Sequence, residues 1–348
     1  MEKTKQKIGT MKELSEAIGI SRPTLSRYFQ DPSSVRSTTS RKIKERLEEV
    51  DYVYNFIATR QNRKSSGLVG VIIPYYNDLF FTSLLEAIEG AARYAGLTVI
   101  TQSSDGDAEG EVQAIARLRS MNADGAIIAP LGLASSTEAF QMAREDFPIV
   151  FTDSRPAQEV QDADFVGTNN TQSIASIVEY LCRTGESPIF LGMPRLNSNA
   201  IEREAAYTKK MRDFGLDPRF VDAEGASESW EFEAYGLSVM DRHFSRQKHI
   251  SETILCANDR IAIGAIRAAN KHGLFARNPE RRNGLRIAGH DDHPLSEYMY
   301  PAITTAGQDI SGIGEDAVRV LLERIRGERV DAPVSIFKDS VLRIREST

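Results

Sequence analysis

Several polar and aromatic side chains follow short apolar segments of this 348-residue sequence, at positions where a binding site could be built. The polar ones supply carboxylates, amides and one guanidinium, which exchange hydrogen bonds with hydroxyl groups. The aromatic ones can pack against the apolar face of a sugar ring. This chemistry favours a sugar or an acidic sugar derivative as ligand, with a nucleobase as the second candidate. The residues are Phe80, Phe81, Asp153, Arg203, Asn258, Asp291 and Gln308.

A repeating strand-then-helix pattern from residue 67 onward must position these side chains. Short apolar runs such as 68–73 and 149–152 predict buried strands, and the amphipathic runs between them predict helices. Alternating elements of this kind form a parallel sheet that is covered by helices on both faces. The segment is long for one open sheet, so we expect two. Ligands of such sheets bind beyond the carboxyl ends of the strands, which is where the side chains above fall.

The first 64 residues differ in charge from the rest of the chain. They hold 14 Lys and Arg against 8 Asp and Glu, a net charge of +6, whereas the other 284 residues have a net charge of −12. A basic segment on an acidic protein is typical of binding to a polyanion, although a solvated basic face would give the same numbers.

Three short helices are predicted in this basic head. Thr10 and Glu13 have the spacing of a capping box, and Gly19 supplies the left-handed residue that ends the first helix. Ser21 is a good N-cap for a second helix with Pro23 in its first turn. A third helix is expected from about residue 37. Two helices joined by a tight turn and braced by a third make a helix-turn-helix.

The second helix of such a motif enters the major groove of DNA with its N-terminus first. Arg22, Pro23 and Arg27 would then face base edges, where Arg can pair with O6 and N7 of guanine. Thr24 and Ser26 are short donors suited to phosphate oxygens. A three-helix module that docks to a protein is the alternative, but the agreement of capping, turn and basic exposure favours DNA.

The segment 10–27, Thr-Met-Lys-Glu-Leu-Ser-Glu-Ala-Ile-Gly-Ile-Ser-Arg-Pro-Thr-Leu-Ser-Arg, resembles the opening of the lactose-repressor (LacI/GalR) family. Residues 35–55 resemble the family's third helix and the motif that closes it. Residues 67–74, Gly-Leu-Val-Gly-Val-Ile-Ile-Pro, resemble the first strand of its effector domain. The resemblance covers nearly the whole chain. It implies a multidomain fold, with an all-α helix-turn-helix head and an α/β body like a type I periplasmic binding protein, made of two doubly wound parallel-sheet subdomains.

The resemblance also implies domain boundaries. Residues 1–54 would form the DNA-binding domain, 55–66 a hinge helix or linker, and 67–348 the effector-binding and dimerisation domain. Within that last domain, subdomain one would comprise about 67–165 and 307–331, and subdomain two about 166–306 and 332–348.

In this family the hinge segment docks in the minor groove of DNA. The family usually places a leucine wedge where this chain has Gln61, and a polar side chain cannot intercalate between base pairs as an apolar one does. We therefore expect little kinking of the DNA; a plain charged linker is the alternative for this segment. The positions implied to contact DNA are Thr10, Ser21, Arg22, Pro23, Thr24, Ser26, Arg27, Asn55, Ala58, Arg60 and Gln61.

The function implied by the resemblance is that of a cytoplasmic, homodimeric transcription regulator. It would bind double-stranded operator DNA, repress a catabolic operon and respond to a small sugar or sugar derivative in the cleft between its subdomains. A regulator of the purine-responsive branch is the alternative. The family pattern adds Trp230 to the seven candidate effector contacts above. Asp259 is expected to cap the helix that follows it, and either Phe80 or Phe81 would serve equally well in the core.

Catalytic and membrane functions are disfavoured by the motifs. The chain has no P-loop and no Gly-x-Ser-x-Gly elbow, and its one Gly-x-Gly falls inside a helical pattern. Cys182 and Cys256 lack zinc-ligand spacing, so neither a metal nor another cofactor is expected. No apolar run approaches the ~18–20 residues of a membrane span. A glycosidase that uses Asp153 and Asp291 stays a minor alternative. An exported solute-binding protein is another, but it would need a signal peptide, and the charged residues 1–7 are not followed by the apolar run of one.

Overall fold

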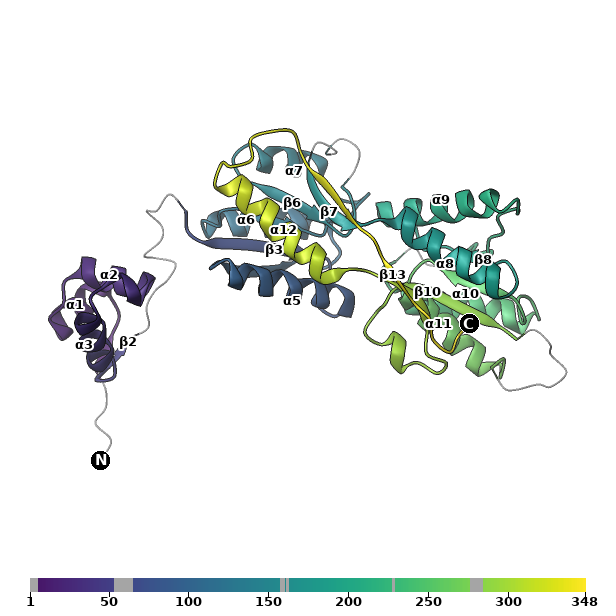
Figure 1. The fold of residues 1–348 in the computed structure, drawn as a ribbon, viewed down its shortest axis with the longest axis horizontal. Coiled ribbons are helices and arrows are strands. Elements are labelled where there is room, and N and C mark those ends of the chain that lie inside the picture. Colours follow the sequence, from purple (N-terminus) through teal and green to yellow (C-terminus); the bar gives the residue numbers. More distant parts are fainter. Residues whose placement is uncertain (1–5, 53–64, 157–159, 161–162, 227–228, 276–283) are drawn as a thin grey trace, which may run out of the picture. The chain divides into compact units, whose positions relative to one another are not determined.

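The structure is a computed structural model that describes residues 6–52, 65–156, 160, 163–226, 229–275 and 284–348. The chain divides into two compact units, Met1–Ser66 and Gly67–Thr348 (Figure 1). Each unit is described separately below. Among the described residues, no helix is both long enough and apolar enough to cross a lipid bilayer.

The head is a small helical unit, as the sequence predicts. It contains α1 (Met11–Ile18), α2 (Arg22–Gln30), a short 3₁₀ turn η1 (Pro32–Ser34) and α3 (Ser37–Leu47). Strands β1 (Gln6–Ile8) and β2 (Val50–Tyr52), which the sequence did not predict, pair in parallel. The apolar positions of the three helices point inward because they recur at helical spacing. Their core is Ile8, Leu14, Ile18, Leu25 and Ile43.

Thr10 and Ser21 are the N-caps of α1 and α2, as expected, but their side-chain hydrogen bonds follow the expected pattern only in part. The Glu13 amide donates to Thr10 Oγ1 at 3.2 Å, the Glu13 carboxylate accepts from the Gly9 amide at 2.9 Å, and Gly19 has a φ of 64°. The side chain of Ser21 accepts no hydrogen bond from a helix amide; its hydroxyl instead pairs with the hydroxyl of Thr24 at 2.9 Å. The expected capping role of the Ser21 side chain is therefore wrong, because a nearer hydroxyl competes for it.

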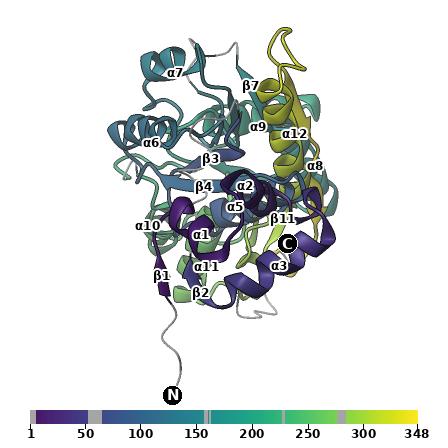
Figure 2. The ribbon, with the colours of Figure 1, turned by 90° about the vertical axis from the view of Figure 1, so that its left-hand side faces the viewer.

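The first half of the body is built on a six-stranded sheet in the order β12-β7-β6-β5-β3-β4, with every neighbouring pair parallel. We call this sheet and its four helices lobe 1. Helices α5 and α12 pack on one face, and α6 and α7 pack on the other (Figure 2). The elements are β3 (Leu68–Ile73), α5 (Leu79–Tyr94), β4 (Thr98–Ser103), α6 (Ala108–Ser120), β5 (Ala126–Ile128), α7 (Thr137–Arg144), β6 (Ile149–Thr152), β7 (Asp164–Thr168), α12 (Ile310–Ile325) and β12 (Ser335–Lys338).

The second half, lobe 2, is built on a five-stranded sheet in the order β13-β11-β10-β9-β8. Its strands are parallel except for β13, which runs antiparallel to β11 at the edge. Both halves thus have the buried parallel sheet that the apolar runs predict. The elements are α8 (Asn170–Thr184), β8 (Ile189–Leu191), α9 (Ser198–Asp213), α10 (Phe232–Ser245), β9 (Thr253–Cys256), α11 (Asp259–Lys271), β10 (Arg286–Asp291), η3 (Ser296–Tyr298), β11 (Thr304–Gly307) and β13 (Val341–Arg343).

Within the described residues the chain passes between the lobes three times: from β7 to α8, from β11 to α12, and from β12 to β13. All of β7 lies in lobe 1, and β12 pairs with it there. The expected boundary at 165–166 therefore falls inside a strand, and the assignment of all of 332–348 to subdomain two is wrong for β12. The sequence pattern could not show this, because β12 is an edge strand with only alternate residues partly buried, and its partner strand is remote in sequence.

Candidate functional site

A cleft between the two lobes contains most of the predicted effector contacts. Its cavity volume is only about 30 Å³, room for one or two water molecules, so the two lobes lie closed on one another in this structure. Gln308 is not among the residues that line it. The lining residues are Asp78, Phe80, Phe81, Asp153, Met193, Asn197, Asn199, Arg203, Trp230, Phe232, Asn258, Arg260, Asp291 and His293.

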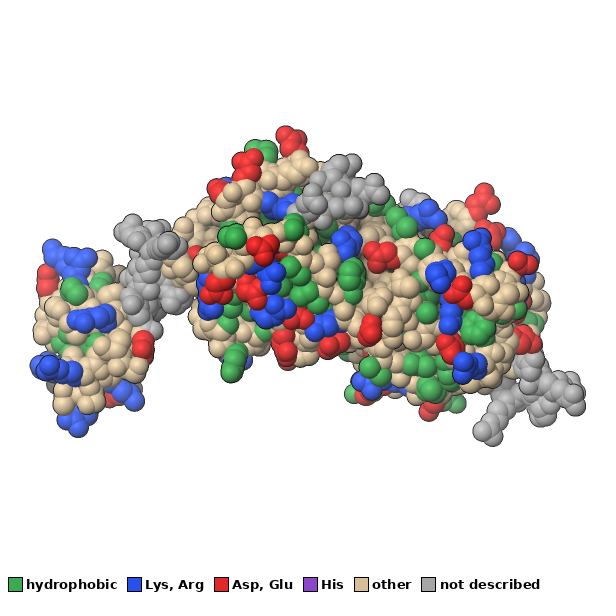
Figure 3. All heavy atoms as spheres, turned by 45° about the horizontal axis from the view of Figure 1, so that its top comes forward, with side chains coloured by type: hydrophobic (Ala, Val, Ile, Leu, Met, Phe, Trp, Pro, Cys, Tyr) green, Lys and Arg blue, Asp and Glu red, His purple; other side chains and the backbone are tan. Residues whose placement is uncertain are grey.

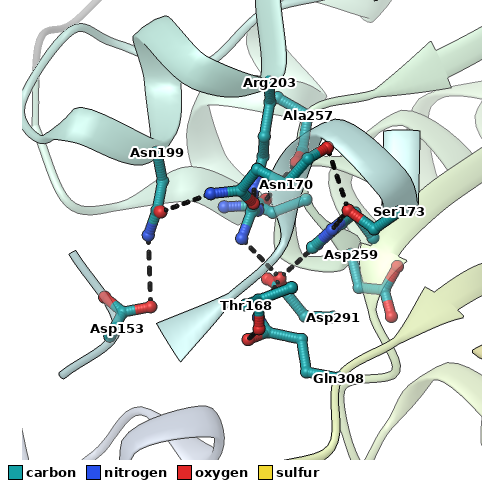
Figure 4. Close-up of polar contacts among 12 residues, drawn as sticks. Asp153, Thr168, Asn170, Ser173, Asn199, Arg203, Ala257, Asp259, Asp291 and Gln308 are labelled. Atoms are coloured by element: carbon teal, nitrogen blue, oxygen red, sulfur yellow. Dashed lines mark hydrogen bonds and ion pairs between the residues drawn. The ribbon is translucent and has the colours of Figure 1, made fainter. Parts of the chain in front are cut away.

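Arg203 lies in the middle of this cleft, on α9, with its side chain only 3% exposed. All three nitrogens of its guanidinium contact protein oxygens. Nε donates to Asn170 Oδ1 at 3.0 Å, Nη1 donates to the Ala257 carbonyl at 2.9 Å, and Nη2 lies 2.9 Å from Asp291 Oδ1 (Figure 4). A buried guanidinium needs such partners, and this one is fixed in place by them.

Asp291, the last residue of β10, gathers three donors on one oxygen. Besides Arg203, His290 Nδ1 and Gln308 Nε2 each lie 2.7 Å from Asp291 Oδ1. Burial opposes ionisation of this carboxyl, but the Arg203 guanidinium and the hydrogen bonds outweigh it and lower the pKa of Asp291 to about 2. Asp291 is therefore an anion at neutral pH, and its backbone φ of 116° lies in the region that L-residues rarely adopt.

His290, which contacts Asp291, is neutral. Its ring is completely buried and is held between Asp291 and the Ser173 hydroxyl, which lies 2.7 Å from Nε2. Burial, with the Arg203 charge adding to it, lowers the pKa of His290 to about 4. The ring therefore connects Asp291 to α8 as a hydrogen-bonding group and not as a cation.

Asp153 follows β6 in lobe 1 and faces lobe 2 across the cleft. Asn199 of α9 donates to Asp153 Oδ1 at 3.1 Å (Figure 4). Burial raises the pKa of Asp153 to about 7, although the charge of Arg203 acts in the opposite direction. Its φ of 63° is left-handed, a conformation that Asp and Asn tolerate better than most residues.

Asn258 takes the capping role that was expected of Asp259, and it also lines the cleft. Asn258 is the N-cap of α11, and its Oδ1 accepts from the Ile261 amide at 2.8 Å. Asp259 is fully buried and is held by the hydroxyls of Thr305 at 2.8 Å and Ser296 at 2.7 Å. The expectation that Asp259 caps the helix is therefore wrong, because Asn and Asp cap equally well and α11 begins one residue earlier than the pattern suggested.

Aromatic rings form one wall of the cleft, centred on Trp230. Its ring lies 5.7 Å from Phe232, 6.1 Å from Tyr75 and 6.5 Å from Phe81, and it packs against the cores of both lobes. Phe81 is buried in the core of lobe 1 and also lines the cleft, whereas Phe80 is only half-buried. Trp230 thus contacts the two bodies that a bound ligand would hold together.

Two residues that the sequence did not single out join the lobes at the cleft. Arg260 lies on α11, and Asp78 lies at the start of α5. Arg260 Nη1 donates to Asp78 Oδ2 at 2.8 Å. Arg260 also pairs with Glu233 at 2.7 Å and lies 5.2 Å from the ring of Phe232. Asp78 follows β3 just as Asp153 follows β6, and that shared position at a strand end was the signal that could have found it.

Gln308 connects the cleft to a crossover between the lobes. It follows β11, donates to Asp291, and accepts a hydrogen bond from the hydroxyl of Thr168 at the end of β7 (Figure 4). The expected contact of Gln308 with the effector stays a prediction. Its side chain contacts Asp291 and not the free space of the cleft.

The head presents the predicted face of α2 to solvent. Arg22, Pro23 and Arg27 are exposed, and Thr24 and Ser26 are half-buried. Basic side chains are scattered over the visible surface of the head, among backbone and side chains of other kinds (Figure 3). The expected hinge contacts lie outside the described residues: Asn55, Ala58, Arg60 and Gln61.

Comparisons with known proteins fit both parts of the chain. A periplasmic binding protein domain model matches residues 69–329, and a helix-turn-helix model matches 2–54. The HTH-type transcriptional regulator RegA of Clostridium saccharobutylicum is 25% identical over 344 residues, which cover 97% of this chain and 99% of RegA.

Solved structures of regulators share the fold. A Lac repressor dimer bound to operator and the anti-inducer ONPF is similar with a TM-score of 0.78 and 22% identity, over 97% of this chain and 98% of that one. The regulator CelR in complex with cellobiose is similar with a TM-score of 0.66 and 20% identity, over 98% of this chain and 100% of that one. With a helix-turn-helix head joined to a periplasmic-binding-protein body, this chain belongs to the LacI/GalR family of transcriptional regulators.

Proposed function

We propose that this regulator is a homodimeric repressor whose affinity for a specific operator is set by a sugar bound in the cleft between its lobes. The observation that carries the proposal is the polar cleft itself. Both lobes supply its walls, and contacts such as Asn199 to Asp153 cross it. A ligand held there contacts both lobes and therefore biases their relative position.

DNA recognition is assigned to the exposed face of α2. Of its two exposed arginines, Arg22 is the first residue of α2, at the N-terminus that enters a major groove in this motif, and Arg27 lies in its last turn. One head makes few contacts, so a two-fold dimer that reads two half-sites is the expected form. The operator-bound Lac repressor dimer of the same fold supports this arrangement.

A sugar is the favoured effector because carboxylates and amides lie close to a wall of aromatic rings. Asp153, Asp291 and Asn258 can exchange hydrogen bonds with hydroxyls, and Trp230 offers an apolar surface to a ring face. The cellobiose complex of CelR, which shares this fold, supports the choice of ligand class.

Coupling between cleft and operator would act through closure of the lobes about the three crossovers. Only a ligand that binds one lobe arrangement better than the other shifts the equilibrium. A coupling of ~1–3 kcal/mol would change operator affinity about 5–150-fold. The effector can act as inducer or corepressor, depending on which arrangement binds DNA.

The test starts with selection of bound sequences from a random pool of double-stranded DNA by the full-length protein. We expect an enriched pseudo-palindrome that binds two chains, measured by mass photometry. Operator affinity is then measured by fluorescence anisotropy with neutral sugars, amino sugars, sugar acids, sugar phosphates and purines. Failure to enrich any sequence would refute the DNA assignment. A response to purines alone would refute the sugar assignment and leave the regulator intact.

A further inference from the structure

The acidic groups of the cleft outnumber its cations. Three carboxyl groups line it, those of Asp78, Asp153 and Asp291, against the two guanidiniums of Arg203 and Arg260. Burial lowers the pKa of His293, the one histidine in the lining, so that it adds no charge at neutral pH. The cleft therefore has one carboxyl group more than it has cations, and it carries excess negative charge when all three carboxyls are ionised.

Both guanidiniums are already engaged. The three guanidinium nitrogens of Arg203 contact oxygens of Asn170, Ala257 and Asp291. Nη1 of Arg260 donates to Asp78. Its Nε and Nη2 donate to the two carboxylate oxygens of Glu233, both at 2.7 Å. Each guanidinium keeps two further N–H donors, but its charge is already matched by a carboxylate, that of Asp291 for Arg203 and those of Asp78 and Glu233 for Arg260. An anionic ligand would therefore add negative charge that no cation of the cleft compensates.

Asp153 is the carboxyl left without a cation. Among the described residues the Asn199 amide donates to Asp153 at 3.1 Å, and no Lys or Arg nitrogen lies within ion-pair distance of this carboxyl. The pKa of about 7 that burial gives Asp153 is consistent with this deficit. A partly buried carboxylate is stabilised most by a charged donor at hydrogen-bond distance.

We infer that the effector carries a protonated amine that pairs with Asp153, so that the ligand class is an aminated sugar or polyol. This inference rests on the proposed function, because it assumes a sugar-like ligand in the cleft. An amine fits better than a metal ion, since no group of three or more His, Cys, Asp or Glu in the described part of the chain could hold one. The remaining hydroxyls would contact Asp291 and Asn258, and the ring would pack near Trp230.

The test compares sugars that differ only in charge. Isothermal titration calorimetry of the full-length protein is run with glucose, galactose and mannose, with their 2-amino and 6-amino-6-deoxy forms, and with their uronic acids. At least one amino sugar should bind about tenfold more tightly than its neutral counterpart. The uronic acids should not bind.

Asp153→Asn assigns the effect to one residue. Asn is nearly isosteric, tolerates the left-handed backbone, and keeps an oxygen for the Asn199 amide. The variant should lose the tenfold preference for the amine and keep binding of the neutral form. Asp217→Asn is the matched control, because it removes the same charge from an exposed position outside the cleft and should keep the preference.

The outcomes separate the two proposals. A neutral sugar or uronic acid that binds as tightly as the amino forms would overturn the inference and leave the sugar-responsive regulator standing. An amine preference that survives in Asp153→Asn would also overturn it. Absence of binding by every sugar in the panel would contradict the proposed function itself.

Discussion

Arg260 of lobe 2 lies 2.8 Å from Asp78 of lobe 1, and this ion pair joins the lobes across the cleft. Both side chains are largely buried, at 17% and 6% exposed. Each is also anchored in its own lobe: Asp78 Oδ1 caps the Phe80 amide at 2.9 Å, and Arg260 pairs with Glu233. The closed arrangement therefore has a stabilising contact that needs no ligand.

Asp78→Asn should open the cleft and weaken the lobe–lobe contact. Asn keeps the N-cap of α5, so the change isolates the charge that faces Arg260. Loss of a hydrogen bond between charged groups should reduce stability by about 1–3 kcal/mol in urea unfolding, and small-angle X-ray scattering should show a larger radius of gyration. Asp213→Asn, which breaks the exposed pair with Lys209, is the control and should change neither quantity. An unchanged radius in Asp78→Asn would argue against the pair as a closing contact.

Gln308→Leu should uncouple effector binding from the operator response. The side chain connects Asp291 to Thr168 at the crossover and does not line the cleft. We expect effector affinity within a few-fold of wild type and a much smaller effect of effector on operator affinity, both measured by titration. Thr168→Val removes the other end of the same connection. The double variant should therefore lose no more of the effector's effect on operator affinity than either single variant. Additive losses would show that the two residues act separately.

Arg27→Ala should reduce sequence-specific binding. Arg27 is exposed on α2. Its backbone carbonyl accepts hydrogen bonds from the amide of the C-cap residue and from the Ser34 hydroxyl, and these bonds survive the substitution. Loss of a bidentate contact to guanine would cost ~1–3 kcal/mol and relax specificity at one base pair. Competition binding with single-base operator variants measures this. Arg46→Ala, exposed on α3, should weaken all sequences equally, and the assignment fails if the two variants behave alike.

Glu111→Gln should change how stability depends on pH. Glu111 of α6 is 1% exposed, and its Oε1 accepts from the Leu131 amide at 3.0 Å. Burial raises its pKa from 4.5 to about 7, so between these values the folded protein holds a proton that the unfolded chain has lost. The free energy of unfolding therefore falls as pH rises through this window, and above it the destabilisation by this group is complete and no longer changes with pH.

In thermal unfolding, the stability of Glu111→Gln relative to wild type should increase between about pH 5 and pH 7.5, by about 3 kcal/mol at most. Above that range the difference in unfolding free energy should stay constant. Glu109→Gln on the same helix is exposed and should follow wild type at every pH. A difference for Glu111→Gln that does not vary with pH would contradict the raised pKa.

The sequence predicted the parts of the site that depend on local position. Asp153, Asn258 and Asp291 were found because polar residues at the carboxyl ends of parallel strands must meet at one edge. The contact of Arg260 with Asp78 was not predicted, because the two residues come from different lobes and are 182 positions apart. The pairing of β12 with β7 was missed for the same reason.

Short-range competition limited the prediction as well. The side chain of Ser21 bonds to Thr24 and not to a helix amide, and Asn258 takes the cap expected of Asp259. These alternatives differ by a fraction of a hydrogen bond's free energy, which sequence patterns cannot resolve. Strands β1 and β2, three residues each, were too short to produce a periodic signal.

The left-handed backbone at Asp153 has a consequence for how ligand choice can change during evolution. At a φ of 63°, Asn and Gly fit as easily as Asp, whereas a β-branched or bulky residue is strained. Accepted replacements at this position should therefore alter the charge or size of the site while the surrounding backbone stays as it is. A gene duplicate could acquire a response to a differently charged metabolite by a single codon change, with its DNA-reading head untouched.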